Sequence, residues 1–456
     1  MNAAGNIAVL DVGKTNAKLV IVDARSGKEV AARNTANRVI DSGPYPHHDV
    51  DALWQFFTEA LRSFAREPGF DAISVTAHGA AAALLGADKL AMPVIDYEFI
   101  YPEMVQGEYD AIRPDFAETG SPRLPGGLNV GAQLHYQKTC FPADFANVRK
   151  IVTYAQYWTW QLTGIAVNEL TSLGCHTDLW NPHQGGFSSL VGRLGIAGLL
   201  APIKPAFEPI GKLTPGLTQT LGLPAPVPVY CGIHDSNASL LPHLVSREAP
   251  FSVISTGTWV VCFAAGGQIA TLDPLRDTLI NIDAHGNPVP SARFMGGREF
   301  DIACRGNAAT EPNAATIARV IENRHMILPA LVAGSGPFPQ THAAVPDLAS
   351  LDPEERVVVA SLYAALMTQT CLQLISGAGI TIVEGPFARN GVYLSALRTS
   401  TGRDVIAWPG STGTSLGAAI LAGAQAPSSD GGVMATPLDV DFSDYARLWH
   451  QRARAS

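Results

Sequence analysis

The chain has 456 residues, more than one ordinary hydrophobic core holds, so two large domains with a ligand-binding cleft between them are expected. Its 47% hydrophobic and 16% charged residues fit a well-packed globular protein and exclude extended disorder. The formal charge is −9 and no Lys/Arg block is present, so neither nucleic acid nor a membrane surface is an expected partner. Without a signal-peptide pattern or an apolar run of about 20 residues, a cytoplasmic location is expected; a homodimer is left open.

The cysteines stand alone in the sequence, without a CxxC pair or a His at zinc-finger spacing. Buried free thiols are therefore expected rather than a metal site. The six positions are Cys140, Cys175, Cys231, Cys262, Cys304 and Cys371.

The first half of the chain alternates strand and helix patterns. Two apolar runs, 7–11 and 17–23, are joined by a polar, Gly-containing turn and predict a β-hairpin. Helical spacing over 51–65 precedes a buried strand at 72–76. An aromatic-rich helix is expected over 154–162, ended by Gly164.

The middle of the chain carries a Pro-rich stretch and then a strand. Residues 202–228 are expected to form a surface connector, and 227–232 a strand that leads into His234 and Asp235. A second strand–turn–strand pattern begins at Phe251 and turns at 255–258. Because this repeats the opening of the chain, two domains of similar plan are expected, 1–245 and 246–456.

The last part of the chain reads as a long helix over 355–374, a strand over 381–384, a turn over 385–390, and helices over 392–399 and 415–424.

Phosphoryl transfer needs backbone N–H groups around phosphate oxygens, a carboxylate near Mg²⁺ and a base for the attacking hydroxyl. The turn from Asp11 to Lys18 offers an acid at a strand end, a glycine and polar side chains. Taken alone, this turn is explained better as an ordinary polar hairpin than as a phosphate-binding turn. The turn Ser255-Thr256-Gly257-Thr258 adds a second glycine turn, and two such turns facing each other suit a triphosphate.

Asp235 follows a strand and opens a predicted helix, which is a position that suits a general base at the edge of a sheet. The alternative is that Asp235 only caps the helix, which is a common role for Asp there.

Four motifs in this order resemble the FGGY carbohydrate kinases over nearly the whole chain. They are the turn from Asp11 to Lys18, Gly232-x-x-Asp235, the turn 255–258 and the Gly417-Ala418-Ala419 helix. The segment from Tyr154 to Gly164, which ends in Leu-Thr-Gly, also resembles that family.

The resemblance implies an α/β fold of two actin-like (ribonuclease H-like) domains with the active site in the cleft between them. The N-terminal domain would hold the sugar and the C-terminal domain the nucleotide, with ATP and Mg²⁺ required. Asp235 would be the general base and Asp11 the acid near Mg²⁺, which Asp235 also faces. Nucleotide contacts would come from Gly13, Lys14, Thr15, Asn16, Lys18, Gly257, Thr258, Gly385, Asn390 and Gly413.

The chain departs from the family pattern at several places. The residue after the first-turn glycine is usually Thr or Ser and is Lys14 here. The adenosine segment, usually a Gly run, reads Glu-Gly-Pro-Phe-Ala-Arg-Asn over 384–390.

Residues 76–81 are spaced like the Thr-x-x-Gly-x-Asp segment of the rhamnulose and fuculose kinases, with Ala81 in place of the Asp. The implied acceptor is a ketose or deoxyketose such as L-rhamnulose or L-fuculose. The predicted substrate residues are His78, Asp96, Glu98, His234 and Asp235.

Other roles for these side chains are left open. His78 is equally well explained as a core histidine bonded to backbone, and Asp96 and Glu98 as solvated loop acids. His47 and His48 are expected on a surface loop, while Gln156 is a further residue that would face the sugar.

Two other functions compete with the kinase. An actin-fold ATPase would act without a small-molecule acceptor, and it would not need Asp235 as a base. A sugar sensor would be expected to lose Asp11 or Asp235, and both are present.

Overall fold

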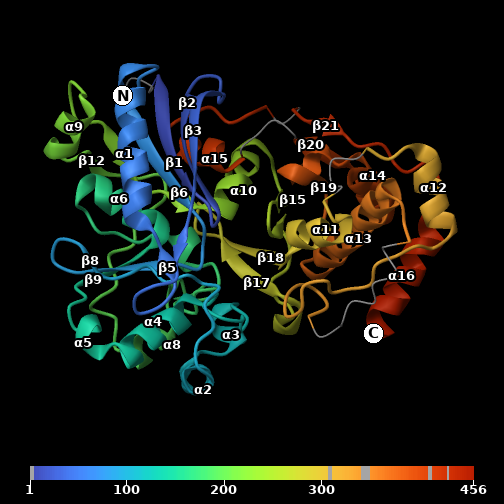
Figure 1. The fold of residues 1–456 in the computed structure, drawn as a ribbon, viewed down its shortest axis with the longest axis horizontal. Coiled ribbons are helices and arrows are strands. Elements are labelled where there is room, and N and C mark those ends of the chain that lie inside the picture. Colours follow the sequence, from blue (N-terminus) through green and yellow to red (C-terminus); the bar gives the residue numbers. More distant parts are fainter. Residues whose placement is uncertain (1–4, 307–310, 340–349, 409–412, 429–430, 456) are drawn as a thin grey trace. The chain divides into compact units, whose positions relative to one another are not determined.

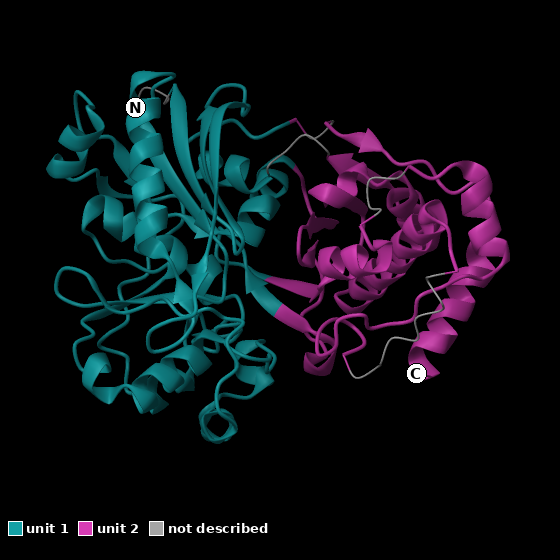
Figure 2. Ribbon diagram, in the orientation of Figure 1, with its two compact units in different colours: residues 1–246, 280–288, 412–427 teal, residues 247–279, 289–411, 428–456 magenta. Residues whose placement is uncertain are grey.

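The computed structural model describes residues 5–306, 311–339, 350–408, 413–428 and 431–455 (Figure 1). The chain forms two compact units (Figure 2). Unit 1 comprises residues 1–246, 280–288 and 412–427, and unit 2 comprises 247–279, 289–411 and 428–456. The main division falls at residue 246, and two short segments from the second half join unit 1. Which unit holds which substrate stays a prediction.

Unit 1 is built on a sheet with the strand order β12-β13-β6-β1-β2-β3, and β14 also pairs with β6. Strand β1 is antiparallel to β2 and parallel to β6. The strands are β1 (Asn6–Val12), β2 (Asn16–Asp23), β3 (Glu29–Ala36), β6 (Ala72–Ala77), β12 (Pro209–Lys212), β13 (Pro228–Tyr230) and β14 (Ile233–His234).

Helices cover both faces of this sheet, because residues on β1 alternate between two apolar clusters. Ala8 and Leu10 face the cluster of α1 (Val50–Arg66) and α6 (Tyr154–Thr163). Ile7 and Val9 face the cluster of α10 (Asp235–Ser246) and α15 (Gly413–Leu421).

Smaller elements of unit 1 surround this core. The strands are β4 (Val39–Ile40), β5 (His47–His48), β7 (Ala82–Leu85), β8 (Leu90–Met92), β9 (Lys150–Thr153), β10 (Trp180–Asn181) and β11 (Gly186–Phe187). The helices are α2 (Glu103–Ile112), α3 (Phe116–Thr119), α4 (Val130–Cys140), α5 (Pro142–Phe145), α7 (Leu170–Leu173), α8 (Ser189–Arg193) and α9 (Pro215–Leu221).

Unit 2 is built on a sheet with the order β17-β18-β16-β15-β19-β20-β21, of which residues 280–282 of β17 and Pro288 of β18 are assigned to unit 1. Its strands are β15 (Phe251–Thr256), β16 (Val260–Ala265), β17 (Thr278–Ile282), β18 (Pro288–Phe294), β19 (Ile380–Glu384), β20 (Val405–Trp408) and β21 (Val433–Met434). Its helices are α11 (Gly296–Cys304), α12 (Ala314–Glu322), α13 (Pro353–Leu374), α14 (Gly391–Thr401) and α16 (Ser443–Ala455), with short 3₁₀ helices η1 (Pro274–Arg276) and η2 (Pro386–Arg389).

The two sheets repeat one plan. In unit 1 the strands run β3-β2-β1-β6-β13, and in unit 2 they run β18-β16-β15-β19-β20. Each sheet contains an antiparallel hairpin, β1–β2 in unit 1 and β15–β16 in unit 2. The first strand of each hairpin also pairs in parallel with a strand that comes later in the chain, β6 or β19. The predicted α/β fold with two domains of similar plan is confirmed.

Most predicted elements are present, with one clear error. Both hairpins, the helix ended by Gly164 and the strand of 72–76 form as expected. The stretch 202–228 is not a surface connector, because it contains β12 and α9 and leads into β13. Two of its prolines lie where proline is tolerated: Pro209 opens an edge strand and Pro215 begins a helix.

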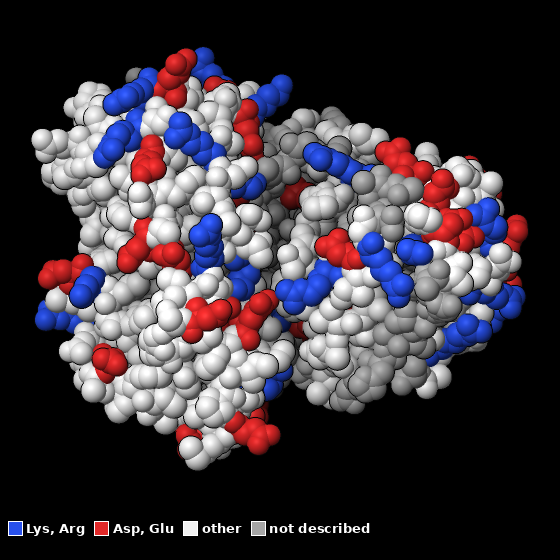
Figure 3. All heavy atoms as spheres, in the orientation of Figure 1, with Lys and Arg blue, Asp and Glu red and all other residues white. Residues whose placement is uncertain are grey.

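One helix of the described residues, α13 (Pro353–Leu374), is long and apolar enough to cross a membrane, but 83% of its apolar window is buried in the protein. It forms the core of unit 2. On the face drawn in Figure 3, acidic and basic side chains of the described residues are interspersed rather than gathered by sign. Five of the six cysteines are buried free thiols as predicted, and Cys140 is exposed.

Helices α10 and α15 approach closely where Gly417 faces the backbone of Ala238. A Cβ at Gly417 would overlap the Ala238 carbonyl oxygen. We expect Gly417→Ala to destabilise unit 1 by roughly 1–3 kcal/mol, because overpacking forces the backbone to shift. The midpoint of thermal unfolding measures this. Gly391→Ala is the matched control, since its Cβ would meet nothing within 4 Å; an equal effect of both variants would contradict the packing argument.

Candidate active site

The sheet of unit 1 brings two carboxylates to the same edge. Strands β1 and β14 both run parallel to β6 and lie on either side of it. Thr76 of β6 pairs with Asp11 on one side and with Ile233 on the other, two residues before Asp235. Asp11 and Asp235 therefore lie at the carboxyl ends of neighbouring parallel strands, where open α/β sheets bind ligands.

Asp11 is buried, and its side-chain hydrogen bonds and ion pair within the described residues all fall on one oxygen. The Thr414 hydroxyl donates to Oδ2 at 2.7 Å and the Ser415 hydroxyl at 3.2 Å, both from the start of α15. The Lys18 ammonium lies 3.8 Å from the same atom. The described residues give Oδ1 no hydrogen bond, so one oxygen is left for a cation.

Asp235 is the first residue of α10, and its side chain is 26% exposed. Its Oδ1 accepts from the Ser236 N–H at 2.6 Å and lies 3.2 Å from His234 Nε2. Burial raises the pKa of the Asp235 carboxyl to about 7, and the negative charge of Asp11 adds to the rise. The carboxyl thus changes its charge near neutral pH, which suits a general base.

The turn before Asp235 is held from several sides. Gly232 has φ +87°, and a Cβ there would lie 2.9 Å from the Val75 carbonyl oxygen. The carbonyl of Cys231 accepts from Gln156 Nε2 at 2.8 Å and from the Thr159 hydroxyl at 3.1 Å. Only glycine allows this backbone shape at this approach, so Gly232 is required by the turn.

The next part of the same turn depends on a buried acid. The His234 N–H donates to Thr171 Oγ1 at 3.0 Å, and the Thr171 hydroxyl donates to Glu169 Oε2 at 2.5 Å. Burial raises the pKa of Glu169 to about 7. Glu169 and Thr171 act as positioning residues, because they fix the backbone that leads into Asp235.

Lys14 and Asp96 form an ion pair, although they were predicted for different substrates. Lys14 Nζ lies 2.6 Å from Asp96 Oδ1 and 5.2 Å from the centre of the Tyr97 ring. Glu98, in contrast, is exposed, and its backbone N–H donates to Asp96 at 3.2 Å. Of the two predicted loop acids, Asp96 is the one turned into the protein.

His78 is both a core histidine and a candidate ligand. Its Nδ1 lies 2.8 Å from the Gly79 carbonyl oxygen, while its buried Nε2 has no partner within the described structure. Burial lowers the pKa of His78 to about 4, despite the Gly79 hydrogen bond, and the Lys14 charge lowers it further. The neutral ring then donates through Nδ1, so Nε2 is an unpaired acceptor.

His48 was predicted on the surface, and this is wrong for its side chain. His48 is 1% exposed and stacks on Tyr154 at 5.6 Å, and its ring lies 5.0 Å from the His78 ring. It precedes Asp49, whose side chain caps α1 by accepting from the Ala52 N–H. The residue before an N-cap often packs inward, which was the available signal.

Gln156 was expected to face the sugar, but both ends of its amide have protein partners. Nε2 donates to the Cys231 carbonyl, and Oε1 accepts from the Thr153 hydroxyl at 2.5 Å. Its observed role is therefore to hold the turn before Asp235.

The second glycine turn, in unit 2, packs against the segment predicted for adenosine. Gly257 and Thr258 are exposed, and the Gly257 N–H donates to the Trp259 carbonyl at 2.8 Å. The Thr256 hydroxyl donates to the Glu384 carbonyl and accepts from the Phe387 N–H. Gly385 has φ +79°, and a Cβ there would overlap Thr256. These contacts place Gly385 beside Thr256, the residue before Gly257.

The remaining predicted nucleotide residues lie in different places. Thr15 and Asn16 are exposed at the tip of the first turn, which is closed by the Gly13 N–H donating to the Asn16 carbonyl at 2.9 Å. Asn390 caps α14 through the Tyr393 N–H, and its amide donates to Ser361. Gly413 begins α15 in unit 1, next to the Thr414 that binds Asp11.

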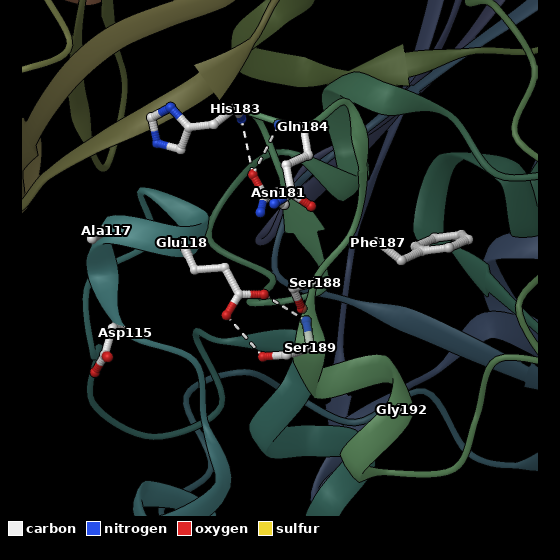
Figure 4. A pocket seen from close by; sticks show the side chains of 10 residues that line it. All are labelled: Asp115, Ala117, Glu118, Asn181, His183, Gln184, Phe187, Ser188, Ser189 and Gly192. Atoms are coloured by element: carbon white, nitrogen blue, oxygen red, sulfur yellow. Dashed lines mark hydrogen bonds between the residues drawn. The ribbon is translucent and has the colours of Figure 1, made fainter.

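Two hollows in unit 1 contain none of the predicted site residues. One, of about 840 Å³, is shown in Figure 4. There the Glu118 carboxylate accepts from the Ser189 N–H and hydroxyl, and Asn181 accepts from two backbone N–H groups. The other, of about 350 Å³, is bordered by His48 and Trp160. The carboxylates that suit phosphate chemistry lie elsewhere.

The carboxylates of Asp11 and Asp235 fit a magnesium ion of the kind that phosphoryl transfer uses. The described residues contain no group of three His, Cys, Asp or Glu side chains that would enclose a metal. Mg²⁺ is usually held by one or two carboxylates, with waters and substrate phosphates completing its shell. Asp11, whose Oδ1 receives no hydrogen bond from the described residues, lies near Asp235 and meets that requirement.

Comparison with known proteins identifies the family. The domain described as "FGGY family of carbohydrate kinases, N-terminal domain" matches residues 111–242, and "Carbohydrate kinase FGGY, C-terminal domain" matches 248–430. An L-fuculokinase of Salmonella typhi is 31% identical over 275 residues, which are 58% of this chain and 57% of that protein. The chain thus aligns with little more than half the length of this curated relative.

Two solved structures share the fold over almost the entire chain. A carbohydrate kinase from Novosphingobium aromaticivorans is 37% identical with a TM-score of 0.86, covering 98% of this chain and all of that one. A xylulose kinase from Lactobacillus acidophilus is 17% identical with a TM-score of 0.78, covering 99% and 96%. The chain belongs to the FGGY family of carbohydrate kinases, and its two units are of the actin-like type.

The raised pKa of Asp235 can be measured directly. In protein without metal or nucleotide, carbon-13 NMR of the carboxyl groups should show Asp235 titrating near pH 7. Asp11→Asn should lower this pKa, because a neighbouring negative charge is removed. An unchanged pKa in Asp11→Asn would mean that the two carboxyls do not interact, and a value near 4 in the wild type would contradict the burial of Asp235.

Proposed function

We propose that this chain is a kinase that transfers the γ-phosphoryl group of ATP to a hydroxyl of a small neutral sugar, with Asp235 as general base. The observation that carries the proposal is the pair of acids at one sheet edge, where burial and then the negative charge of Asp11 raise the pKa of Asp235. An ATPase without an acceptor would need a cation-binding acid but no second carboxylate that titrates near neutral pH. Family membership supports the same activity.

The proposed chemistry assigns one task to each acid. Ionised Asp235 accepts the proton of the sugar hydroxyl as its oxygen bonds to the γ-phosphorus, while the bond from that phosphorus to the β–γ bridging oxygen breaks and ADP leaves. Asp11 holds a cation near the phosphates, with Lys18 beside it. Bound Mg²⁺ would neutralise charge that develops on the phosphate oxygens.

The two units are proposed to divide the substrates between them. Unit 1 carries Asp235, His234, His78 and Asp96, so we assign the sugar to it. Unit 2 carries the exposed turn of Gly257 and Thr258, packed against Gly385, so we assign the nucleotide to it. Exposed glycine turns allow phosphate oxygens to approach backbone N–H groups.

A ketose or deoxyketose such as L-rhamnulose or L-fuculose is the proposed acceptor. The relative from Salmonella typhi is named an L-fuculokinase, and a Pasteurella multocida relative that is 24% identical is named a probable L-xylulose kinase. Both names are of ketose kinases. The neutral His78, with an unpaired buried acceptor, suits a hydroxyl donor of such a sugar.

The test is an acceptor screen combined with removal of the base. With ATP and Mg²⁺, ADP release from a panel of ketoses, deoxyketoses and polyols should show one acceptor far above the water background. Asp235→Asn should lower its turnover by about 10²–10⁴, because the amide keeps the shape but takes up no proton. Asp115→Asn, at an exposed site, is the control. Retained activity in Asp235→Asn would place the base elsewhere.

A separate prediction concerns the turn of Gly257 and Thr258, which we assign to the nucleotide. A Cβ at Gly257 would meet only the Trp259 carbonyl oxygen, at 3.9 Å, so Gly257→Val should fold normally. We expect it to weaken nucleotide binding and leave sugar binding nearly unchanged, since the new side chain blocks phosphate approach to the backbone. Calorimetry with each ligand separates the two. Gly198→Val, with open space around it, is the control; equal loss of both ligands would remove Gly257 from the site.

A further inference from the structure

Lys14 lies in the turn predicted to bind phosphate, yet its side chain is directed to another element. Its ammonium contacts Asp96 at 2.6 Å and lies over the Tyr97 ring at 5.2 Å. Asp96 and Tyr97 belong to the loop after β8, whose backbone is tied to Pro46 through the Asp96 N–H. The contact therefore joins the first turn of the chain to this loop.

The two lysines of the hairpin have separate partners. Lys18 lies across from Asp11 in the strand register and is 3.8 Å from its carboxylate, with 32% of its side chain exposed. Lys14 is only 17% exposed and Asp96 only 9%. Lys18 thus contacts Asp11, the acid proposed to hold the cation, while Lys14 forms a largely buried ion pair with Asp96.

The pair lies beside the histidines of unit 1. The Tyr97 ring contacts the His78 ring edge to face at 5.6 Å, and His78 in turn contacts His48. After burial, the positive charge of Lys14 helps to lower the pKa of His78, and it also contributes at His48. Lys14, Asp96 and His78 are therefore neighbours within unit 1.

The pair has hydrogen-bonding capacity left over. An ammonium has three donors, and Asp96 takes one of them. Both contacts to Asp96, from Lys14 Nζ and the Glu98 N–H, fall on Oδ1, and the described residues leave Oδ2 without a hydrogen bond. A donor and an acceptor thus stand side by side, which matches two adjacent hydroxyls. The ion pair of Lys14 and Asp96 has no net charge, so it offers no excess positive charge to an anion. The carboxylates of Asp11 and Asp235 in the same unit would repel an anionic sugar acid, so a neutral sugar is favoured.

We propose that Lys14 is a specificity residue of the sugar rather than a nucleotide ligand, and that Lys14 and Asp96 together bind a vicinal diol of a neutral sugar. This inference rests on the proposed kinase function, and it names a substrate feature that the catalytic acids do not determine.

The experiment compares Lys14→Met, Lys14→Arg, Asp96→Asn and the double variant Lys14→Met with Asp96→Asn, using the best acceptor of the screen. Lys14→Met should raise the sugar KM about 10- to 100-fold, as expected for losing a hydrogen bond from a charged group, and change the ATP KM less than about twofold. Lys14→Arg should recover part of the loss. Because the residues act together, the double variant should be little worse than either single one.

Binding measurements separate this from a folding defect. Calorimetry with the sugar alone, and with a non-hydrolysable ATP analogue alone, should show the loss only for the sugar. The control is Lys28→Met, in an exposed turn, which should change neither. Thermal unfolding identifies a variant that fails to fold, and Lys14→Arg, which keeps the charge beside Asp96, then decides the question through its own sugar and ATP affinities.

Three results would each contradict a different claim: the role of Lys14, the neutral-diol assignment and the kinase function. If Lys14→Met or Lys14→Arg weakens ATP binding and leaves the sugar KM unchanged, Lys14 is a phosphate ligand and this inference is wrong. If an anionic sugar acid is the best acceptor, the neutral-diol assignment is wrong while the kinase remains. If the wild type phosphorylates no acceptor at all, the proposed function itself fails, whatever the variants do.

Discussion

The site depends on two carboxylates that the sheet of unit 1 forces into one electrostatic environment. Parallel pairing of β6 with both β1 and β14 fixes Asp11 and Asp235 at one edge. Burial raises the pKa of Asp235 to about 7, and the negative charge of Asp11 adds to the rise. Two hydroxyls and Lys18 contact Asp11, while Asp235 is the residue that we propose as the proton acceptor.

Much of the surrounding structure holds this arrangement in place. Gly232 allows the turn that leads to Asp235, while Gln156 and Thr159 hold its first carbonyl. Thr171, oriented by buried Glu169, holds the N–H of His234. These residues never need to touch a substrate, but the position of Asp235 depends on them. Helix α15 returns from the second half of the chain to complete the surroundings of Asp11.

The sequence predicted the parts of the fold that local patterns encode. The two hairpins, their repeated plan and the helix start at Asp235 follow from alternation, glycine turns and helix spacing. The buried place of His48 and the strand within 202–228 were missed, because each depends on tertiary pairing that overrides a Pro-rich, polar composition. Lys14 was assigned by its position in a turn, whereas the direction of a long side chain is set by the charges around it.

Residue types indicated the candidate acids, but they did not indicate which side chains hold those acids in place. An acid at a strand end and another at a helix start are visible in the sequence, so Asp11 and Asp235 were both singled out. Nothing in the sequence indicates that Gln156, Glu169 and Thr171 hold the turn before Asp235, since these roles arise only when distant segments meet. Asp96 and Glu98 are two residues apart in sequence, and only the structure shows that Asp96 is buried and Glu98 exposed.

The central claim is that the phosphoryl group is transferred to a sugar hydroxyl under the control of Asp235. Phosphorus-31 NMR of the complete reaction, with the wild-type protein, ATP, Mg²⁺ and the acceptor, follows the destination of the γ-phosphate directly. The account predicts a sugar phosphate ester formed in equal amount to ADP, with little inorganic phosphate. Inorganic phosphate as the main product, at a rate that does not depend on the sugar, would contradict it.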